Sequence, residues 1–78
     1  MQGMQFDKEL DAKGLSCQLP ILKTKKALNE LRSGQVLKVI ATDTGSIKDM
    51  QAFSRQTGNA LLSSTEEDNA FVFLMRKK

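Results

Sequence analysis

Cys17 is the only cysteine of this chain, and it stands in the run Gly14-Leu15-Ser16-Cys17-Gln18-Leu19-Pro20. Proline is tolerated in the first turn of a helix, because the N–H that it lacks would be unpaired there, so Pro20 predicts that a helix begins close to the cysteine. Unpaired amides and the positive end of the helix macrodipole stabilise a thiolate, which is the nucleophilic form of the sulfur. The sequence therefore predicts a readily ionised thiol.

The absence of histidine limits what this thiol can do. Cysteine hydrolases need a base, most often histidine, so a protease or esterase is not expected, and dithiol exchange within the chain needs a second cysteine. Neither a disulfide nor a cysteine/histidine zinc site can form, and we expect no metal or cofactor. Thiol exchange with other molecules, oxidant sensing and transport of sulfur as a persulfide remain open. The alternative is that Cys17 is simply a small buried apolar residue.

A length of 78 residues predicts one domain, spanning residues 1–78, with residues 1–4 disordered. The N-terminus shows no signal-peptide pattern, and no apolar run approaches the roughly 20 residues that cross a bilayer, so we expect a cytoplasmic protein. The net charge of +3 is too small to indicate nucleic-acid binding by itself. Basic residues form two groups: Lys23, Lys25 and Lys26, and Arg76, Lys77 and Lys78.

Hydrophobic periodicity predicts the order strand, helix, strand, helix, strand, strand. Residues 5–10 form a short strand candidate with Phe6 and Leu10 on one face. Apolar residues at helical spacing follow Pro20 and stop at Ser33-Gly34, a glycine C-terminal signal. Residues 35–42 are apolar on both faces, which predicts a central strand.

The second half of the chain begins with turn and capping residues. Ser46 and Asp49 have the spacing of a capping box, and the helix that follows them is expected to end at Gly58. A third strand begins at Leu61, residues 66–69 form a polar turn, and residues 71–75 complete a hairpin.

Short connections between these elements predict a parallel first strand pair with right-handed crossovers. The expected fold is an α/β two-layer sandwich of βαβαββ order, in which a four-stranded mixed sheet carries two helices on one face. The other face is either solvated or used for binding. Asp7, Glu9 and Lys38 indicate that at least part of that face is wet.

Residues 10–20, the apolar strand that ends at Thr42-Asp43, the Lys48-Asp49 pair and the terminal hairpin together resemble the TusA (SirA-like) sulfur-carrier family. The resemblance extends from about Phe6 to Arg76. The family signature is a cysteine followed by Pro-x-Pro, with Asp-x-x-Gly-Leu before it. This chain has Gln18 where the first proline is usual.

The resemblance implies a carrier without independent turnover that accepts sulfane sulfur on Cys17 as a persulfide. The donor would be a cysteine desulfurase or a rhodanese-like protein, and the acceptor a DsrE-like or other protein. Pathways served by family members include tRNA thiolation, molybdenum-cofactor supply and oxidative sulfur metabolism. A carrier that presents one thiol to two partners is expected to work as a monomer, without membrane or nucleic-acid partners.

Several residues around Cys17 are candidates for positioning the thiol or docking partners. Leu15, Leu19 and Pro20 are expected to form a small apolar rim, and nearby lysines would attract an anionic partner surface and favour a negative sulfur. For Asp43 the more ordinary interpretation is a helix N-cap, and for Lys48 a surface pair with Asp49. The complete candidate set besides Cys17 is Gly14, Leu15, Leu19, Pro20, Lys23, Lys26, Asp43 and Lys48.

Two other functions remain open from the residues. A small basic nucleic-acid-binding or interaction module is compatible with this fold and with the lysines, although the chain has no Tyr or Trp for base stacking. A redox regulator with one cysteine would instead form a stable sulfenate or mixed disulfide.

Overall fold

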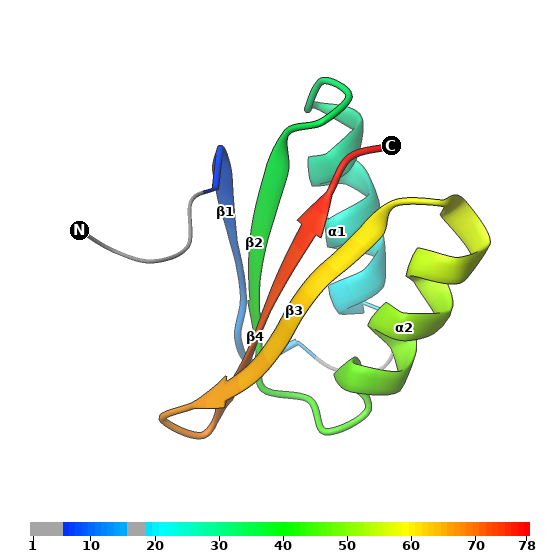
Figure 1. Ribbon diagram of the computed structural model, residues 1–78. Helices are drawn as coiled ribbons and strands as arrows, with labels where there is room; N and C mark the ends of the chain where they lie inside the picture. Colours follow the sequence, from blue (N-terminus) through cyan, green and yellow to red (C-terminus); the bar gives the residue numbers. More distant parts are fainter. Residues whose placement is uncertain (1–5, 16–18) are drawn as a thin grey trace.

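The computed structural model describes residues 6–15 and 19–78 (Figure 1). The expected disorder of residues 1–4 and the strand start at Gln5 therefore lie outside the described residues. The elements follow the expected order: β1 (Lys8–Ala12), α1 (Leu19–Asn29), β2 (Val36–Ala41), α2 (Ser46–Thr57), β3 (Ala60–Glu67) and β4 (Ala70–Arg76).

The four strands form one mixed sheet in the order β1-β2-β4-β3. β1 pairs with β2 in parallel, and β4 pairs antiparallel with both β2 and β3. Both helices cover the same face of this sheet (Figure 1). The predicted two-layer sandwich is confirmed, and β2 is an interior strand, as its apolar sequence indicates.

The core lies between the sheet and the two helices. Alternation along β2 sends Leu37, Val39 and Ala41 into this layer, where all three are fully buried. The other large apolar side chains in this layer come from α1, α2 and β4: Leu28, Met50, Phe53, Phe73 and Met75.

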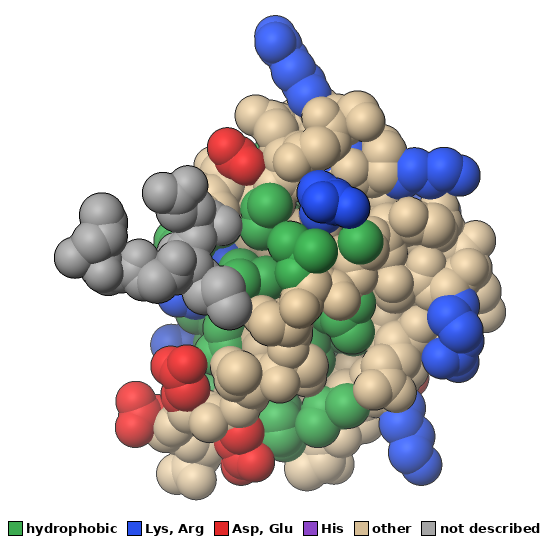
Figure 2. Space-filling view, viewed as in Figure 1, with side chains coloured by type: hydrophobic (Ala, Val, Ile, Leu, Met, Phe, Trp, Pro, Cys, Tyr) green, Lys and Arg blue, Asp and Glu red, His purple; other side chains and the backbone are tan. Residues whose placement is uncertain are grey.

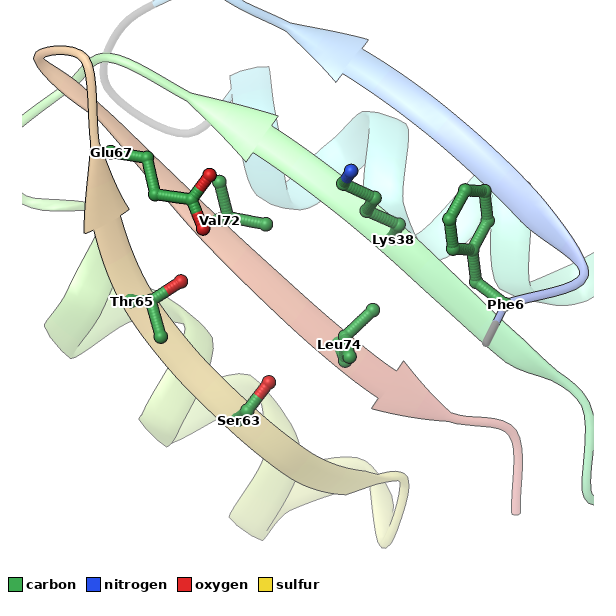
Figure 3. Close-up of a pocket in the computed structure, with 7 residues that line it drawn as sticks. All are labelled: Phe6, Lys38, Ser63, Thr65, Glu67, Val72 and Leu74. Atoms are coloured by element: carbon green, nitrogen blue, oxygen red, sulfur yellow. The ribbon is translucent and has the colours of Figure 1, made fainter. Parts of the chain in front are cut away.

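The first strand differs from the prediction in its start and in the direction of Phe6. β1 begins at Lys8, and a bend at Asp7 precedes it. The Asp7 N–H donates to the Val36 carbonyl at 2.7 Å, and the Asp7 carboxylate accepts the Val36 N–H at 2.8 Å. The Phe6 ring accordingly lies on the open face of the sheet, 5.2 Å from Lys38 Nζ (Figure 3). Leu10, by contrast, packs against the core. The prediction that Phe6 and Leu10 share a face is wrong, because the bend interrupts the strand alternation.

The first helix ends earlier than its glycine signal indicates. α1 stops at Asn29, and the Gly34 N–H donates to the Lys77 carbonyl at 2.8 Å with φ at +90°. Gly34 therefore belongs to a turn that pairs with the end of the chain, and it does not cap the helix. The expected helix end at Ser33-Gly34 is wrong. The chain tightens directly after Asn29, where the Glu30 and Leu31 N–H groups donate to carbonyls three residues back.

The second helix begins without the expected side-chain cap. Its N-cap residue is Gly45, with no side-chain capping bond, and Ser46 is the first helical residue. The Ser46 hydroxyl is buried and has no hydrogen-bond partner among the described residues. Asp43 accepts from the Gly45 N–H through its carboxylate, at 3.5 Å. The predicted capping box from Ser46 to Asp49 and the N-cap role for Asp43 are thus both wrong, while the predicted stop at Gly58, with φ at +83°, is confirmed.

The hairpin turn is shorter than predicted. Glu66 and Glu67 belong to β3, and the turn is made by Asp68 and Asn69, with φ values of 49° and 65°. Two successive positive φ values characterise the tight turns whose twist matches a hairpin, and Asp and Asn tolerate them better than most residues.

Candidate functional site

The predicted nucleophile, Cys17, lies outside the described residues, together with Ser16 and Gln18. The structure does describe the residues on both sides of this segment. Leu15 is the last described residue before the segment, in the connection that follows β1, and Leu19 begins α1. The site is therefore built from these two flanks and from the surfaces beside them.

The chain before the segment is anchored to the end of β2. The Gly14 N–H donates to the Thr42 hydroxyl at 2.9 Å, and Gly14 has a φ of +81°, a conformation that favours glycine. The Leu15 N–H donates to the Ala12 carbonyl at 3.3 Å, and the Leu15 side chain packs against the core. Gly14 and Leu15 thus hold the approach to the segment, and Thr42 is a positioning residue that sequence reasoning missed.

The chain after the segment is anchored by Pro20. It lies in the first turn of α1, as predicted, and its side chain is fully buried. Its carbonyl accepts the buried Thr24 hydroxyl at 2.7 Å, one helical turn later. Because Pro20 is buried, the expectation that it contributes to an exposed apolar rim is wrong. Its buried side chain instead anchors the first turn of α1 in the interior of the protein.

The exposed apolar surface near the segment comes from two leucines of α1. Leu19 is 47% exposed, as the rim prediction requires, and Leu22 is 54% exposed. Both line a groove of about 760 Å³ between α1 and α2, which also includes Asp49, Ala52 and Phe53. Sequence reasoning missed Leu22, although its position away from the buried stripe of α1 is a signal that an apolar residue faces outward.

The lysines of α1 do not all face this groove. Lys25 lines it, whereas Lys23 and Lys26 are exposed and do not line it. Lys26 contributes weakly to lowering the pKa of the Glu30 carboxyl, whose principal partner is Lys8 through a hydrogen bond. A role for Lys23 and Lys26 in docking remains a prediction, and the lysine that the structure places beside the leucines is Lys25.

Asp43 and Lys48 lie at the same end of the sheet as the Gly14 turn. Asp43 follows Thr42, which holds Gly14, and is half-buried in the connection to α2. Lys48 is exposed in the first turn of α2. Asp49, which the sequence paired with Lys48, instead lines the α1–α2 groove.

The arrangement of helices and strands is also found in a solved structure. The crystal structure of the SirA-like protein from Desulfitobacterium hafniense superposes with a TM-score of 0.80 and 28% sequence identity, over 90% of this chain and 96% of that chain. The structural class is therefore that of SirA-like proteins.

The sequence comparisons define the family more closely. The family model described as Sulfurtransferase TusA matches residues 8–77. The chain is 62% identical over 72 residues to the sulfur carrier protein TusA of Allochromatium vinosum, covering 92% of this chain and 95% of that protein. It is 51% identical over 74 residues to the putative sulfur carrier protein YrkI of Bacillus subtilis, covering 95% and 99%. The chain belongs to the TusA family, which confirms the resemblance seen in the sequence.

Proposed function

We propose that this protein is a sulfur carrier that binds sulfane sulfur as a persulfide on Cys17 and passes it to a partner protein. The observation that carries the proposal is the 62% identity, over nearly the full length of both chains, to a protein named as a sulfur carrier. It favours this function over nucleic-acid binding and over a redox regulator.

The transfer chemistry needs only the thiolate and its partners. The Cys17 thiolate attacks the terminal sulfur of a donor persulfide, an S–S bond forms as the donor S–S bond breaks, and the donor leaves as a thiolate. An acceptor thiolate then attacks the same terminal sulfur and releases Cys17. No external oxidant or reductant is consumed. The amides at the start of α1 and the lysines of that helix supply positive charge that stabilises the anionic persulfide.

Docking of partners is assigned to the surface beside Leu19. Two exposed leucines next to the site give a partner an apolar contact, since large exposed apolar groups on a small protein often mark an interaction surface. Gly14, Leu15 and Pro20 position the segment. The charged candidate residues would contact a docked partner around the edge of this apolar surface; they are Lys23, Lys26, Asp43 and Lys48.

The partners and the location follow from the same proposal. A cysteine desulfurase or rhodanese-like protein acts as donor, and a DsrE-like or other thiol protein acts as acceptor, in a pathway such as tRNA thiolation or sulfur oxidation. The carrier is a cytoplasmic monomer. Within the described residues, the helices are all too short or too polar to cross a membrane.

Loading of the protein is the direct test. The chain is incubated with a cysteine desulfurase and cysteine, and its intact mass is measured. We expect a gain of one sulfur atom that reductant removes, and no gain in Cys17→Ser, a nearly isosteric control whose circular dichroism should match that of the wild type. Absence of an adduct with desulfurase and with rhodanese-type donors, or equal loading of the serine variant, would contradict the proposal.

A further inference from the structure

A second concavity, rich in lysine, adjoins the groove between the helices. It has a volume of about 400 Å³, and Lys25, Lys77 and Lys78 line it together with polar residues and with Leu28 and Phe53. Among the described residues, none of those that line it has a carboxylate side chain. We call it the lysine pocket.

The backbone that carries two of these lysines is anchored. The Lys77 N–H donates to the Gln35 carbonyl at 2.7 Å. The Lys78 N–H donates to the side-chain oxygen of Asn59 at 2.8 Å, and Asn59, only 7% exposed, also donates to the Thr57 hydroxyl at 2.9 Å. The backbone of the lysine pocket is therefore held in place, because a backbone hydrogen bond and part-buried side-chain hydrogen bonds anchor it.

Interaction with the C-terminus of a helix explains the position of only some of these lysines. Lysines near a helix C-terminus offset the macrodipole, and the Lys78 side chain does lie against Gly58, the C-cap of α2. Lys25, however, precedes the last turn of α1, whose basic residue is Lys26. Within residues 6–15 and 19–78, the one ion pair is Lys8 with Glu30, so Lys25, Lys77 and Lys78 have no carboxylate partner there. Three unpaired cations around one concavity attract an anionic group.

The lysine pocket is continuous with the groove that begins beside the Cys17 segment. Lys25 and Phe53 line both concavities. Along α1, Leu19 and Lys25 are about 9 Å apart at the normal helical rise. The combined surface is apolar at Leu19 and Leu22, beside the Cys17 segment, carries Asp49 along the groove, and is basic at the end formed by the lysine pocket.

We infer that this surface binds an acidic segment of a partner that exchanges sulfur with Cys17, with apolar side chains in the groove and carboxylates in the lysine pocket. The inference rests on the proposed sulfur-carrier function, since only that function requires a protein to dock beside the thiol. Charge complementarity selects the chemistry of the segment, because basic groups at one end match carboxylates and exclude a basic partner. Attachment at the lysine pocket leaves the Leu19 end of the groove, beside the Cys17 segment, free for the reacting group.

The test measures binding to the full chain carrying Cys17→Ser, so that no sulfur is transferred. The probes are a synthetic peptide in which leucines precede glutamates, the same peptide with lysines in place of the glutamates, and inorganic phosphate. Backbone amide resonances are followed by NMR during each titration. We expect the glutamate peptide to shift resonances of both Leu22 and Lys77, and the lysine peptide to shift neither.

Charge-reversal variants locate the binding. Lys25→Glu and Lys77→Glu should each weaken binding of the glutamate peptide by about tenfold or more, because repulsion replaces attraction. Arg76→Glu is the matched control. It makes the same charge change beside Lys77 but on an exposed residue that lines neither concavity, and it should bind like the parent.

Three results would overturn the inference: no binding of the glutamate peptide, equal weakening by Arg76→Glu, or shifts confined to the lysine pocket that phosphate reproduces, which would indicate a simple anion site. Because Cys17 is absent from this assay, its outcome is independent of sulfur loading. Peptide binding without loading of the wild-type protein would refute the carrier function alone, and loading without peptide binding would refute the docking surface alone.

Discussion

The two faces of this molecule place their exposed apolar side chains differently relative to the Cys17 segment. On the open face of the sheet, Leu74 is only 4% exposed although no helix covers it. Phe6 and Lys38 lie beside it around a shallow concavity of about 320 Å³ (Figure 3). On the helix side, Leu19 and Leu22 are about half exposed, next to the Cys17 segment. Phe6, however, is 40% exposed on the open face. Both faces therefore expose apolar side chains, and the helix side differs in placing two exposed leucines beside the Cys17 segment.

Charge is also distributed unevenly over the surface. Figure 2 shows hydrophobic side chains over the middle of the sheet, carboxylates gathered near the β3–β4 hairpin, and most lysine and arginine side chains toward the upper and right margins. The lysine pocket lies at the C-terminal ends of α1 and α2, away from that hairpin. The inferred docking surface places recognition on the helix side, where the groove and the lysine pocket lie.

Leu74→Ala should produce the largest change in stability among the variants that compare the two faces. Removing a nearly buried leucine leaves a cavity beside Phe6 and Val72, and the free energy of unfolding should fall by about 2–3 kcal/mol. Chemical denaturation measures this loss, and sulfur loading of the folded fraction should be unchanged. A loss below about 0.5 kcal/mol would mean that the open face is not part of the folded core.

Leu22→Ser should have the opposite profile. Because Leu22 is 54% exposed, the free energy of unfolding should change by no more than about 0.5 kcal/mol. The KM for loading by a protein donor should rise about tenfold, as expected for truncation of an interface anchor. Leu62→Ser is the control, since Leu62 is 48% exposed on β3 and away from the groove. Equal KM values for Leu22→Ser and Leu62→Ser would contradict the proposal that donors dock on the helix side.

Much of the fold follows from the sequence because burial and periodicity coincide. The apolar run of residues 35–42 predicts an interior strand, and the helical stripe through Thr24 and Leu28 predicts the first helix. The structure confirms both elements and buries Leu37, Val39 and Ala41 between the sheet and the helices. The bend at Asp7 could not be predicted, since it forms hydrogen bonds with the distant Val36. The role of Gly34 could not be predicted for the same reason, because its N–H pairs with the distant Lys77 carbonyl.

The site was only partly predictable for the same reason. Cys17 and Pro20 stand out because their chemistry and spacing are local. The lysine pocket combines Lys25 with Lys77 and Lys78, and no local pattern predicts that these distant positions meet. Thr42 was missed because its role is a hydrogen bond to Gly14, a residue far away in the chain.

Thr42→Val should lower the free energy of unfolding by less than Leu74→Ala does. Thr42 follows β2, at the edge of the sheet where the Gly14 turn lies. The substitution removes the acceptor of the Gly14 N–H and should lower the free energy of unfolding by about 1 kcal/mol. Hydrogen exchange of the Gly14 amide should become faster, while that of the Leu37 amide should change only as far as global stability does. Unchanged exchange at Gly14 would show that Thr42 does not hold the turn.

The smallest expected effect concerns an exposed ion pair. Lys8 lowers the pKa of Glu30, first through a hydrogen bond and then through its charge. A carboxyl with a lowered folded-state pKa stabilises the fold above its unfolded pKa, and this contribution disappears as pH falls through the lowered value. In Lys8→Ala, an NMR titration should show the pKa of Glu30 rising toward its ordinary value. No movement of that pKa would contradict the assigned cause.

Relay of radioactive sulfur is the most direct test of the central claim. A desulfurase charged with labelled cysteine, the carrier and a thiol acceptor protein are mixed, and label on the acceptor is counted. The account predicts acceptor labelling with the wild-type carrier at well above the level seen without it, and no such increase with Cys17→Ser. Equal labelling with the serine variant, or none above background with the wild type, would contradict transport of sulfur by Cys17.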